Sequence, residues 1–180
     1  MPVDTRLTYE DFCLLPEDGK RREIIEGELF VTPSPQTPHQ RAVIRLSSHL
    51  WHFVDSHKLG EVFSAPFDVV FSEFDVVEPD ILFISSANVA VLTNKNVQGA
   101  PDLVVEVLSE NTARADRSVK LKLYGKFGVE EYWIIDPQRP SAEVYRRGAA
   151  GLECVATLSA ADALSSPLLP GFSLVVGSLR

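Results

Sequence analysis

The sequence predicts an α/β protein in which a mixed central β-sheet is flanked by helices. Two segments, 37–58 and 113–127, repeat apolar residues at helical spacing, and short β-rich apolar runs lie between and after them. The order helix, strands, helix, strand is typical of an α/β core with one mixed sheet. We expect an N-terminal hairpin before this core and a C-terminal β extension after it.

The composition indicates a single folded domain with an acidic balance. Of the 180 residues, 45% are hydrophobic and 23% charged, as in ordinary globular proteins. The net charge of −8 argues against a protein that coats nucleic acid by neutralising phosphates. It is compatible with a nuclease, because metal-binding carboxylates add negative charge where the metal supplies the positive one. With two distant cysteines, no membrane-spanning apolar run and no leader-like start, we expect a cytoplasmic protein.

The first elements are expected to be a short helix and a hairpin. Thr8 can cap a helix whose first turn is acidic. The runs 22–25 and 29–32 flank Glu26-Gly27, a pair typical of a tight turn between two strands. A proline-rich loop then leads to the first long helix.

That helix is expected to begin with Thr37 as its cap, Pro38 at the first helical position and Gln40 completing a capping box. It should run to about Lys58, because Gly60 follows. Its apolar face consists of Ala42, Val43, Leu46, Leu50, Phe53 and Val54.

The remaining segments are expected to be strands, apart from the second helix at 113–127. The expected strands are 61–65, 67–71, 76–84, 103–108 and 131–135, followed by 142–145, 152–157 and 172–176 in the tail. We take the core as about 20–137 and the β extension as about 138–180, within one domain. The exposed tail, including Leu168-Leu169-Pro170, is a candidate dimer interface.

Two acids lie in or beside buried strands. Asp80 immediately precedes the apolar run 81–84, where a carboxylate can hold a cation at the end of a sheet; alternatively it is an exposed turn residue after Pro79. Glu106 lies inside the apolar run 103–108, where a carboxylate is costly unless it is paired, hydrogen-bonded or metal-bound. An edge strand or a buried ion pair would also explain it.

The second helix brings a lysine towards these acids. Asp116, Val119, Lys120, Leu123, Tyr124 and Phe127 share one helical face, whereas Lys122 and Lys126 point outward. Lys120 is therefore expected on the inward face, close to the preceding strand. An ordinary Asp116–Lys120 helix pair, or a lysine that extends its amine to solvent, are the alternatives.

Taken in order, these segments resemble the PD-(D/E)XK nuclease superfamily, the restriction-endonuclease-like fold, and in particular its bacterial branch of restriction endonucleases of uncharacterised role. The matching segments extend from about Thr8 to Pro137. They are Ile25-Glu26-Gly27-Glu28, Glu78-Pro79-Asp80-Ile81, Val104-Val105-Glu106-Val107-Leu108-Ser109, Asp116-Arg117 with Lys120 and Tyr124, and Gly128-Val129-Glu130-Glu131-Tyr132-Trp133-Ile134-Ile135-Asp136-Pro137.

The resemblance implies an Mg²⁺-dependent endonuclease (or an Mn²⁺-dependent one) that hydrolyses DNA phosphodiester bonds. It makes Asp80 and Glu106, with the carbonyl of Val107, the metal ligands. Leu108 departs from the pattern, because the superfamily has lysine there. Lys120, from the adjacent helix, then supplies the ammonium.

Three further residues are candidates for supporting roles. Glu28 is a possible additional acid, although a solvated hairpin residue is an equal alternative. His39 lies near the N-terminus of the first long helix, where it could contact a phosphate or simply pack. Tyr124 could hydrogen-bond Lys120 or a ligand, or serve only in the core.

The sequence leaves rival functions open. One is an active DNA endonuclease, expected by resemblance to be a homodimer. Another is a catalytically inactive module of the same fold that acts as a regulatory or binding partner in DNA transactions, which Leu108 and the acidic balance favour. A third treats the acids as a structural ion-pair network in a binding protein. The target sequence cannot be inferred.

Overall fold

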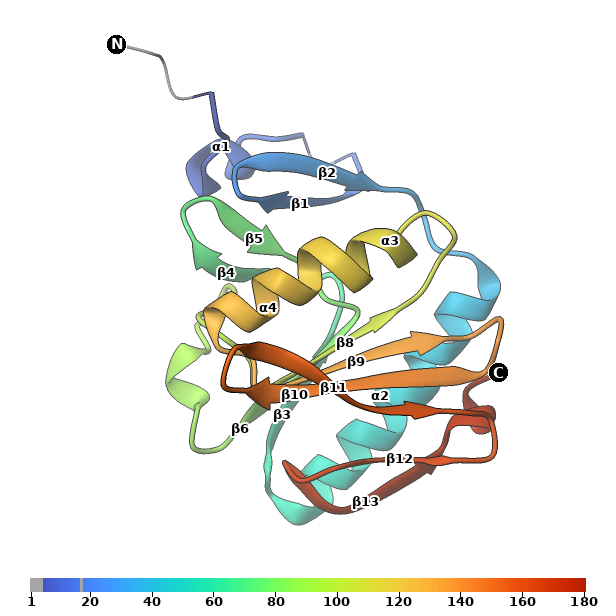
Figure 1. Ribbon diagram of the computed structural model, residues 1–180. Helices are drawn as coiled ribbons and strands as arrows, with labels where there is room; N and C mark the ends of the chain where they lie inside the picture. Colours follow the sequence, from blue (N-terminus) through green and yellow to red (C-terminus); the bar gives the residue numbers. More distant parts are fainter. Residues whose placement is uncertain (1–4, 17) are drawn as a thin grey trace.

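The computed structural model describes residues 5–16 and 18–180 and confirms the α/β prediction (Figure 1). Helical segments flank a six-stranded mixed sheet, and a second, smaller sheet lies above it in this view. The helical elements are α1 (Tyr9–Cys13), α2 (Thr37–His57), α3 (Ala113–Ala115), the π-helical turn η2 (Asp116–Lys120), α4 (Leu121–Phe127) and the 3₁₀ turns η1 (Val89–Val91) and η3 (Val176–Leu179).

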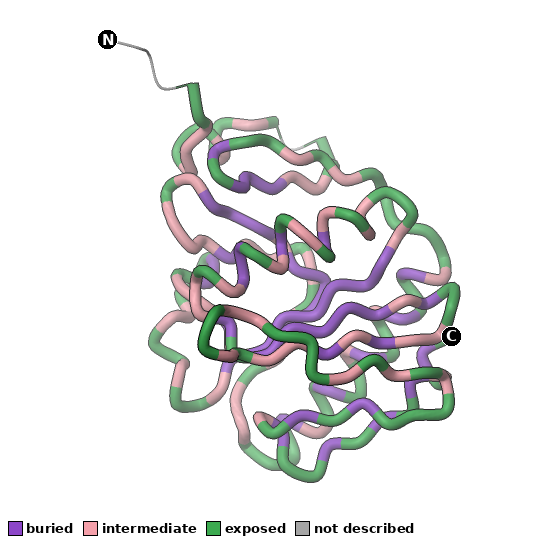
Figure 2. Tube along the Cα trace, in the orientation of Figure 1, coloured by how far each residue is buried: buried purple, intermediate pink, exposed green. Residues whose placement is uncertain are grey.

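The six-stranded sheet has the order β11-β10-β9-β8-β6-β3 and forms the centre of the molecule. Its strands are β3 (Gly60–Ser64), β6 (Ile81–Ser85), β8 (Leu103–Val107), β9 (Glu131–Asp136), β10 (Ser141–Gly148) and β11 (Gly151–Leu158). β8 runs parallel to β9 and antiparallel to β6. Figure 2 shows that the middle strands of this sheet are buried along their length.

The second sheet has the order β2-β1-β5-β4-β7 and contains the predicted N-terminal hairpin. Its strands are β1 (Arg21–Ile25), β2 (Glu28–Thr32), β4 (Val69–Ser72), β5 (Asp75–Val77) and β7 (Val97–Gln98). The hairpin turns at Glu26 and Gly27, which both have positive φ as a tight hairpin turn requires. β12 (Ala163–Ser166) and β13 (Leu169–Val175) form a separate pair.

The side chains of β8 alternate between two cores, and this alternation determines the direction of Glu106. Val105 and Val107 pack with α2 and the C-terminal strands, whereas Val104 and Leu108 pack with α4 and the second sheet. Glu106 has the parity of Val104 and Leu108 and therefore faces α4. Leu108 shares its face, as the strand period predicts, so β8 itself presents no ammonium there.

Antiparallel pairing places the second acid opposite the first. Ile81 pairs with Val105, and Leu82 pairs with Val104. One step further along the same register, Asp80 lies opposite Glu106, on the same face of the sheet. The two acids are thus neighbours although 26 positions separate them in the sequence.

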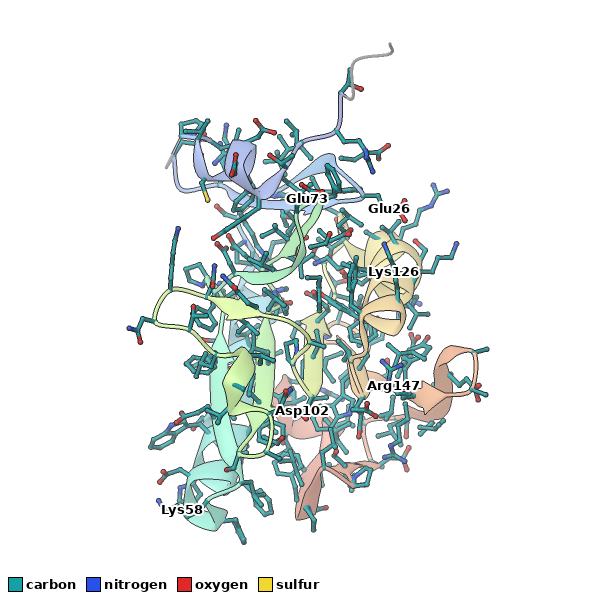
Figure 3. The ribbon with its side chains drawn as sticks, turned by 90° about the vertical axis from the view of Figure 1, so that its left-hand side faces the viewer. Glu26, Lys58, Glu73, Asp102, Lys126 and Arg147 are labelled. Carbon is teal, nitrogen blue, oxygen red and sulfur yellow. The ribbon has the colours of Figure 1, made fainter. Side chains whose placement is uncertain are left out.

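The second helix forms as predicted over 113–127, but a π turn interrupts it. Asp116, Lys120 and Tyr124 are buried, whereas Val119 is 37% exposed, so its predicted inward position is wrong. The wider π turn rotates Val119 off the buried face while keeping Asp116 and Lys120 on it. The outward position of Lys126 is confirmed: Figure 3 shows it on α4 beside Glu26, at the turn of the hairpin.

Several element boundaries differ from the predictions. The expected strand 76–84 is two strands, β5 and β6, in different sheets, because Pro79 interrupts the pairing. Gln36, not Thr37, is the N-cap of α2, and no side chain caps the helix. The strands that we expected in one sheet therefore belong mainly to two sheets, one of six strands and one of five.

The C-terminal segment is integrated into the same core. β10 and β11 extend the central sheet beyond β9, and Leu164, Leu169 and Phe172 share a hydrophobic cluster with α2. Leu169 is fully buried, so our prediction that it is exposed at a dimer interface is wrong. We propose that the chain folds as one domain. No helix in the described residues has the length and apolarity needed to cross a membrane.

Candidate active site

Asp80, Glu106 and Lys120 converge on one pocket of about 270 Å³. It lies beside the first residue of β1 and the N-terminus of α2. The start of β6, which follows Asp80, and the end of β8, at Val107, form another side. The loop 109–112, between β8 and α3, closes another side. Besides the three predicted residues, the lining includes Arg21, Ser34, Gln36, His39, Val107 and Thr112.

Asp80 is held by donors from three elements. Its Oδ2 accepts hydrogen bonds from the backbone N–H of Val107, at 2.7 Å, and lies 3.1 Å from His39 Nε2. Its Oδ1 lies 2.7 Å from Arg21 Nη1. Desolvation acts to raise the pKa of Asp80, but the His39 hydrogen bond and the Arg21 charge outweigh it, so the pKa falls below its usual value. Asp80 is therefore an ionised carboxylate.

Glu106 is held by two donors from the second helix. Its Oε1 accepts hydrogen bonds from Lys120 Nζ, at 2.9 Å, and from the Tyr124 hydroxyl, at 2.7 Å. Its Oε2 lies 3.6 Å from Arg21 Nη2. Glu106 is buried but lines the pocket, so it faces a space that a ligand can enter.

Lys120 lies among three carboxyl groups. Its Nζ is 2.9 Å from Glu106 Oε1, 2.9 Å from Glu23 Oε1 and 3.8 Å from Asp116 Oδ1. Desolvation acts to lower the Lys120 pKa, but Glu106 and Glu23 outweigh it, so the ammonium is retained. Desolvation raises the pKa of Glu106 to about 8 and that of Asp116 to about 6. Lys120 opposes both shifts only in part, because the acids share its single positive charge.

The other candidate residues occupy different places. His39 lies at the pocket, in contact with Asp80, and its Nδ1 has no hydrogen-bond partner among the described residues. Tyr124 is buried against Glu106. Glu28 is exposed at the start of β2 and is not part of the pocket lining, so the structure does not bring it to this site.

Two residues that the sequence did not reveal complete the cluster. Arg21 and Glu23 lie on β1, two positions apart and therefore on one face of the strand. Glu23 pairs with Lys120, and Arg21 spans Asp80 and Glu106. Ile24, on the opposite face, is buried as fully as Ile25, so β1 shows no period-two pattern that could have marked Glu23 as inward-facing.

The donor set fits a hard divalent cation. Each acid keeps one oxygen bound to protein donors and turns the other, Asp80 Oδ1 and Glu106 Oε2, towards the guanidinium of Arg21. A cationic group thus already lies between the two acids. In an extended strand the N–H and C=O of one residue point to the same side, so the Val107 carbonyl faces Asp80 as its N–H does. Oxygen ligands of this kind suit Mg²⁺ or Mn²⁺.

The site differs from a cage of protein ligands. Within residues 5–16 and 18–180, no three His, Cys, Asp or Glu side chains are grouped so that they could hold a metal. An ion here would rely on two carboxylates, one carbonyl and water, and Mg²⁺ is commonly bound with several waters retained.

The hydroxyl of Tyr124 is expected to act by positioning Glu106. If the protein is the metal-dependent endonuclease that the sequence predicts, Tyr124→Phe should lower nicking of DNA about 10-fold, because groups that orient metal ligands typically contribute 10–100-fold. Tyr132→Phe is the matched control, since it removes another buried hydroxyl, which donates to the Asp116 carbonyl. Both variants should lose similar stability in urea denaturation. Equal effects of the two on nicking would contradict a specific role for Tyr124.

Comparison with known proteins identifies a family and a fold for this chain. The family model of Uma2, described as "Putative restriction endonuclease", matches residues 9–177. A solved structure from Anabaena variabilis ATCC 29413, titled a putative nuclease belonging to DUF820, is similar with a TM-score of 0.80. The similarity covers 96% of this chain and 97% of that one, at 22% identity, and so shows a common fold. No curated protein matches the chain. Because the family model spans nearly its whole length, the chain belongs to the Uma2 family of restriction-endonuclease-like proteins.

Proposed function

We propose that this protein is a metal-dependent endonuclease that hydrolyses phosphodiester bonds in DNA. The family description supports a nuclease function. The observation that carries the proposal is the convergence of Asp80, Glu106 and Lys120 on one pocket, although they come from two strands and a helix. Mg²⁺ or Mn²⁺ is the metal that we propose, because the three ligands that we propose, from Asp80, Glu106 and Val107, are all oxygens.

Asp80 Oδ1, Glu106 Oε2 and the Val107 carbonyl would hold the ion. When bound, the metal would polarise the phosphate and lower the pKa of a water ligand. The residues around it set the geometry. Val107 N–H and His39 fix the orientation of Asp80, while Tyr124 and Lys120 fix that of Glu106.

Lys120 would supply the ammonium that β8 does not provide, because Leu108 occupies the position where the superfamily has lysine. Its ammonium lies within hydrogen-bond distance of Glu106 and lines the pocket, so it can orient the attacking water or stabilise charge that develops on the phosphate. His39, at the start of α2, would act by holding Asp80 rather than by binding phosphate, because its Nε2 lies 3.1 Å from Asp80 Oδ2 and its Nδ1 is buried.

A nicking assay tests this function. Supercoiled plasmid incubated with the protein and Mg²⁺ or Mn²⁺ is expected to become nicked, and excess EDTA should prevent the reaction. Asp80→Ala should reduce nicking to background. The matched control is Asp75→Ala, which removes another buried aspartate from outside the pocket and should nick as the wild type does. No nicking by wild-type protein with either metal would refute the proposal.

The second candidate is an inactive module of the same fold that binds a partner in DNA transactions. Arg21 favours it, because its guanidinium lies between the two proposed metal-binding acids. Leu108 favours it as well, by leaving β8 without a lysine. DNA binding without nicking, and without measurable metal binding, is the result that this candidate predicts.

A homodimer also remains a proposal, based on the resemblance and on the need to cut two strands. Light scattering coupled to size-exclusion chromatography, with and without DNA, measures the mass directly. A monomer in both conditions would exclude the dimer.

A further inference from the structure

Arg21 lies where a bound cation would be expected. It begins β1, and its Nη1 is 2.7 Å from Asp80 Oδ1. Its Nη2 is 3.6 Å from Glu106 Oε2 and 3.8 Å from Glu23 Oε1, and also donates to the carbonyl oxygen of Glu78. The planar guanidinium thus spans the two acids that would hold a metal.

The oxygens that face Arg21 are the ones that the other donors leave free. Asp80 Oδ2 and Glu106 Oε1 each bind two other groups of the protein. Asp80 Oδ1 and Glu106 Oε2 face Arg21. A divalent ion that bridged the acids would need these same two oxygens, so the ion and the guanidinium compete for one set of ligands.

The contacts of Arg21 also suggest that it can leave. Its Nε is buried without a hydrogen-bond partner among the described residues, so this position does not satisfy all of its donors. Its side chain is 21% exposed and lines the pocket, whereas Asp80 and Glu106 are at most 4% exposed. After Arg21 turned outward, both acids would keep their remaining protein donors and their orientation.

We propose that Arg21 is an internal competitor for the divalent cation: it pairs with Asp80 and Glu106 in the metal-free protein, and an ion binds both acids only after the guanidinium has moved away. This inference rests on the proposed metal-dependent function. It adds that the metal affinity of the protein is limited by the position of Arg21.

The proposal predicts opposite effects on affinity and stability. The apparent dissociation constant equals the intrinsic one divided by the fraction of molecules in the binding-competent state. If Arg21 bridges the acids in about nine molecules of ten, its removal tightens metal binding about 10-fold. Without metal, the same change leaves Asp80 without its neighbouring guanidinium, whereas Glu106 keeps Lys120. A nine-to-one preference for the bridged state corresponds to about 1.3 kcal/mol, so the melting temperature should fall by roughly 3–5 °C.

The experiment is a calorimetric titration of the full chain with Mn²⁺ and then Mg²⁺, without DNA, together with melting curves. Arg21→Met is expected to bind Mn²⁺ about 10-fold more tightly than wild type, and to regain most of its lost melting temperature when metal is added. Arg22→Met is the matched control: it removes the neighbouring charge, which contacts Asp18 and the Pro16 carbonyl, and should bind Mn²⁺ as wild type does.

A second variant guards against poor folding. Arg21→Lys keeps the charge but cannot bridge both acids with a planar fork, so its affinity should lie between those of wild type and Arg21→Met, with a smaller loss of melting temperature. Wild-type binding of Mn²⁺ with equal or weaker binding by both Arg21 variants would overturn the inference and leave the nuclease proposal intact. If neither wild type nor any variant binds metal, the proposed function fails, and the inference fails with it.

Discussion

Lys120→Met is expected to lower the rate of plasmid nicking about 10²–10³-fold and the free energy of unfolding by about 3–5 kcal/mol. The two losses have different causes. The catalytic loss follows from removing the Lys120 ammonium from its position beside Glu106 and the pocket. The stability loss follows because Glu23, Glu106 and Asp116 would then share a buried region without the cation that they surround.

The two effects can be measured separately. Urea denaturation gives the change in stability, and nicking rates at a temperature where the variant stays folded give the change in activity. Lys122→Met, an exposed change two positions away on the same helix, should alter stability by less than about 0.5 kcal/mol and leave nicking unchanged. A Lys120→Met protein that nicks DNA at the wild-type rate would show that Lys120 serves only the ion-pair cluster.

The elements nearest this site show what the sequence could and could not reveal. Asp80, Glu106 and Lys120 were identifiable because each violates a local pattern: an acid beside or within an apolar strand, and a lysine on an apolar helical face. Such violations can be seen in one segment without knowledge of the fold. The structure brings the three together, as the sequence predicted.

Arg21 and Glu23 violate no local pattern. Charged residues at the start of a hairpin are ordinary, and their importance comes from partners 59 and 97 positions away, Asp80 and Lys120. Local periodicity carries no information about which sheet a hairpin joins. The sequence therefore could not predict that Arg21 and Glu23 join the site, although it predicted Asp80, Glu106 and Lys120.

The π turn explains the helical misprediction in a similar way. The α-helical period of 3.6 residues per turn predicts that Val119 faces inward. No residue type in the segment Asp116–Lys120 indicates that it forms a wider π turn. The turn keeps Asp116 and Lys120 buried together, at the cost of exposing Val119. π turns occur often at functional sites, so this departure from regular geometry at Lys120 is itself consistent with the proposed role.

The second large effect concerns Glu106→Gln, for which we expect nicking to fall about 10³-fold while stability changes by less than about 1 kcal/mol. The substitution keeps the shape of the side chain and an oxygen that can accept from Lys120 or Tyr124, but it removes the negative charge that the metal requires. Stability is spared because burial already disfavours that charge, as the pKa of about 8 indicates. Lys120 also retains Glu23 as a partner at 2.9 Å.

Glu131→Gln is the matched control for Glu106→Gln. Glu131 is an equally buried glutamate on the neighbouring strand, bound by the Trp133 indole and the Ser166 hydroxyl, and it does not line the pocket. Calorimetry with Mn²⁺ should detect binding by Glu131→Gln and none by Glu106→Gln. If Glu106→Gln bound Mn²⁺ normally, Glu106 would not be a ligand. Its burial beside Lys120 would then represent the structural ion-pair network that the sequence left open, and the nuclease proposal would lose its second acid.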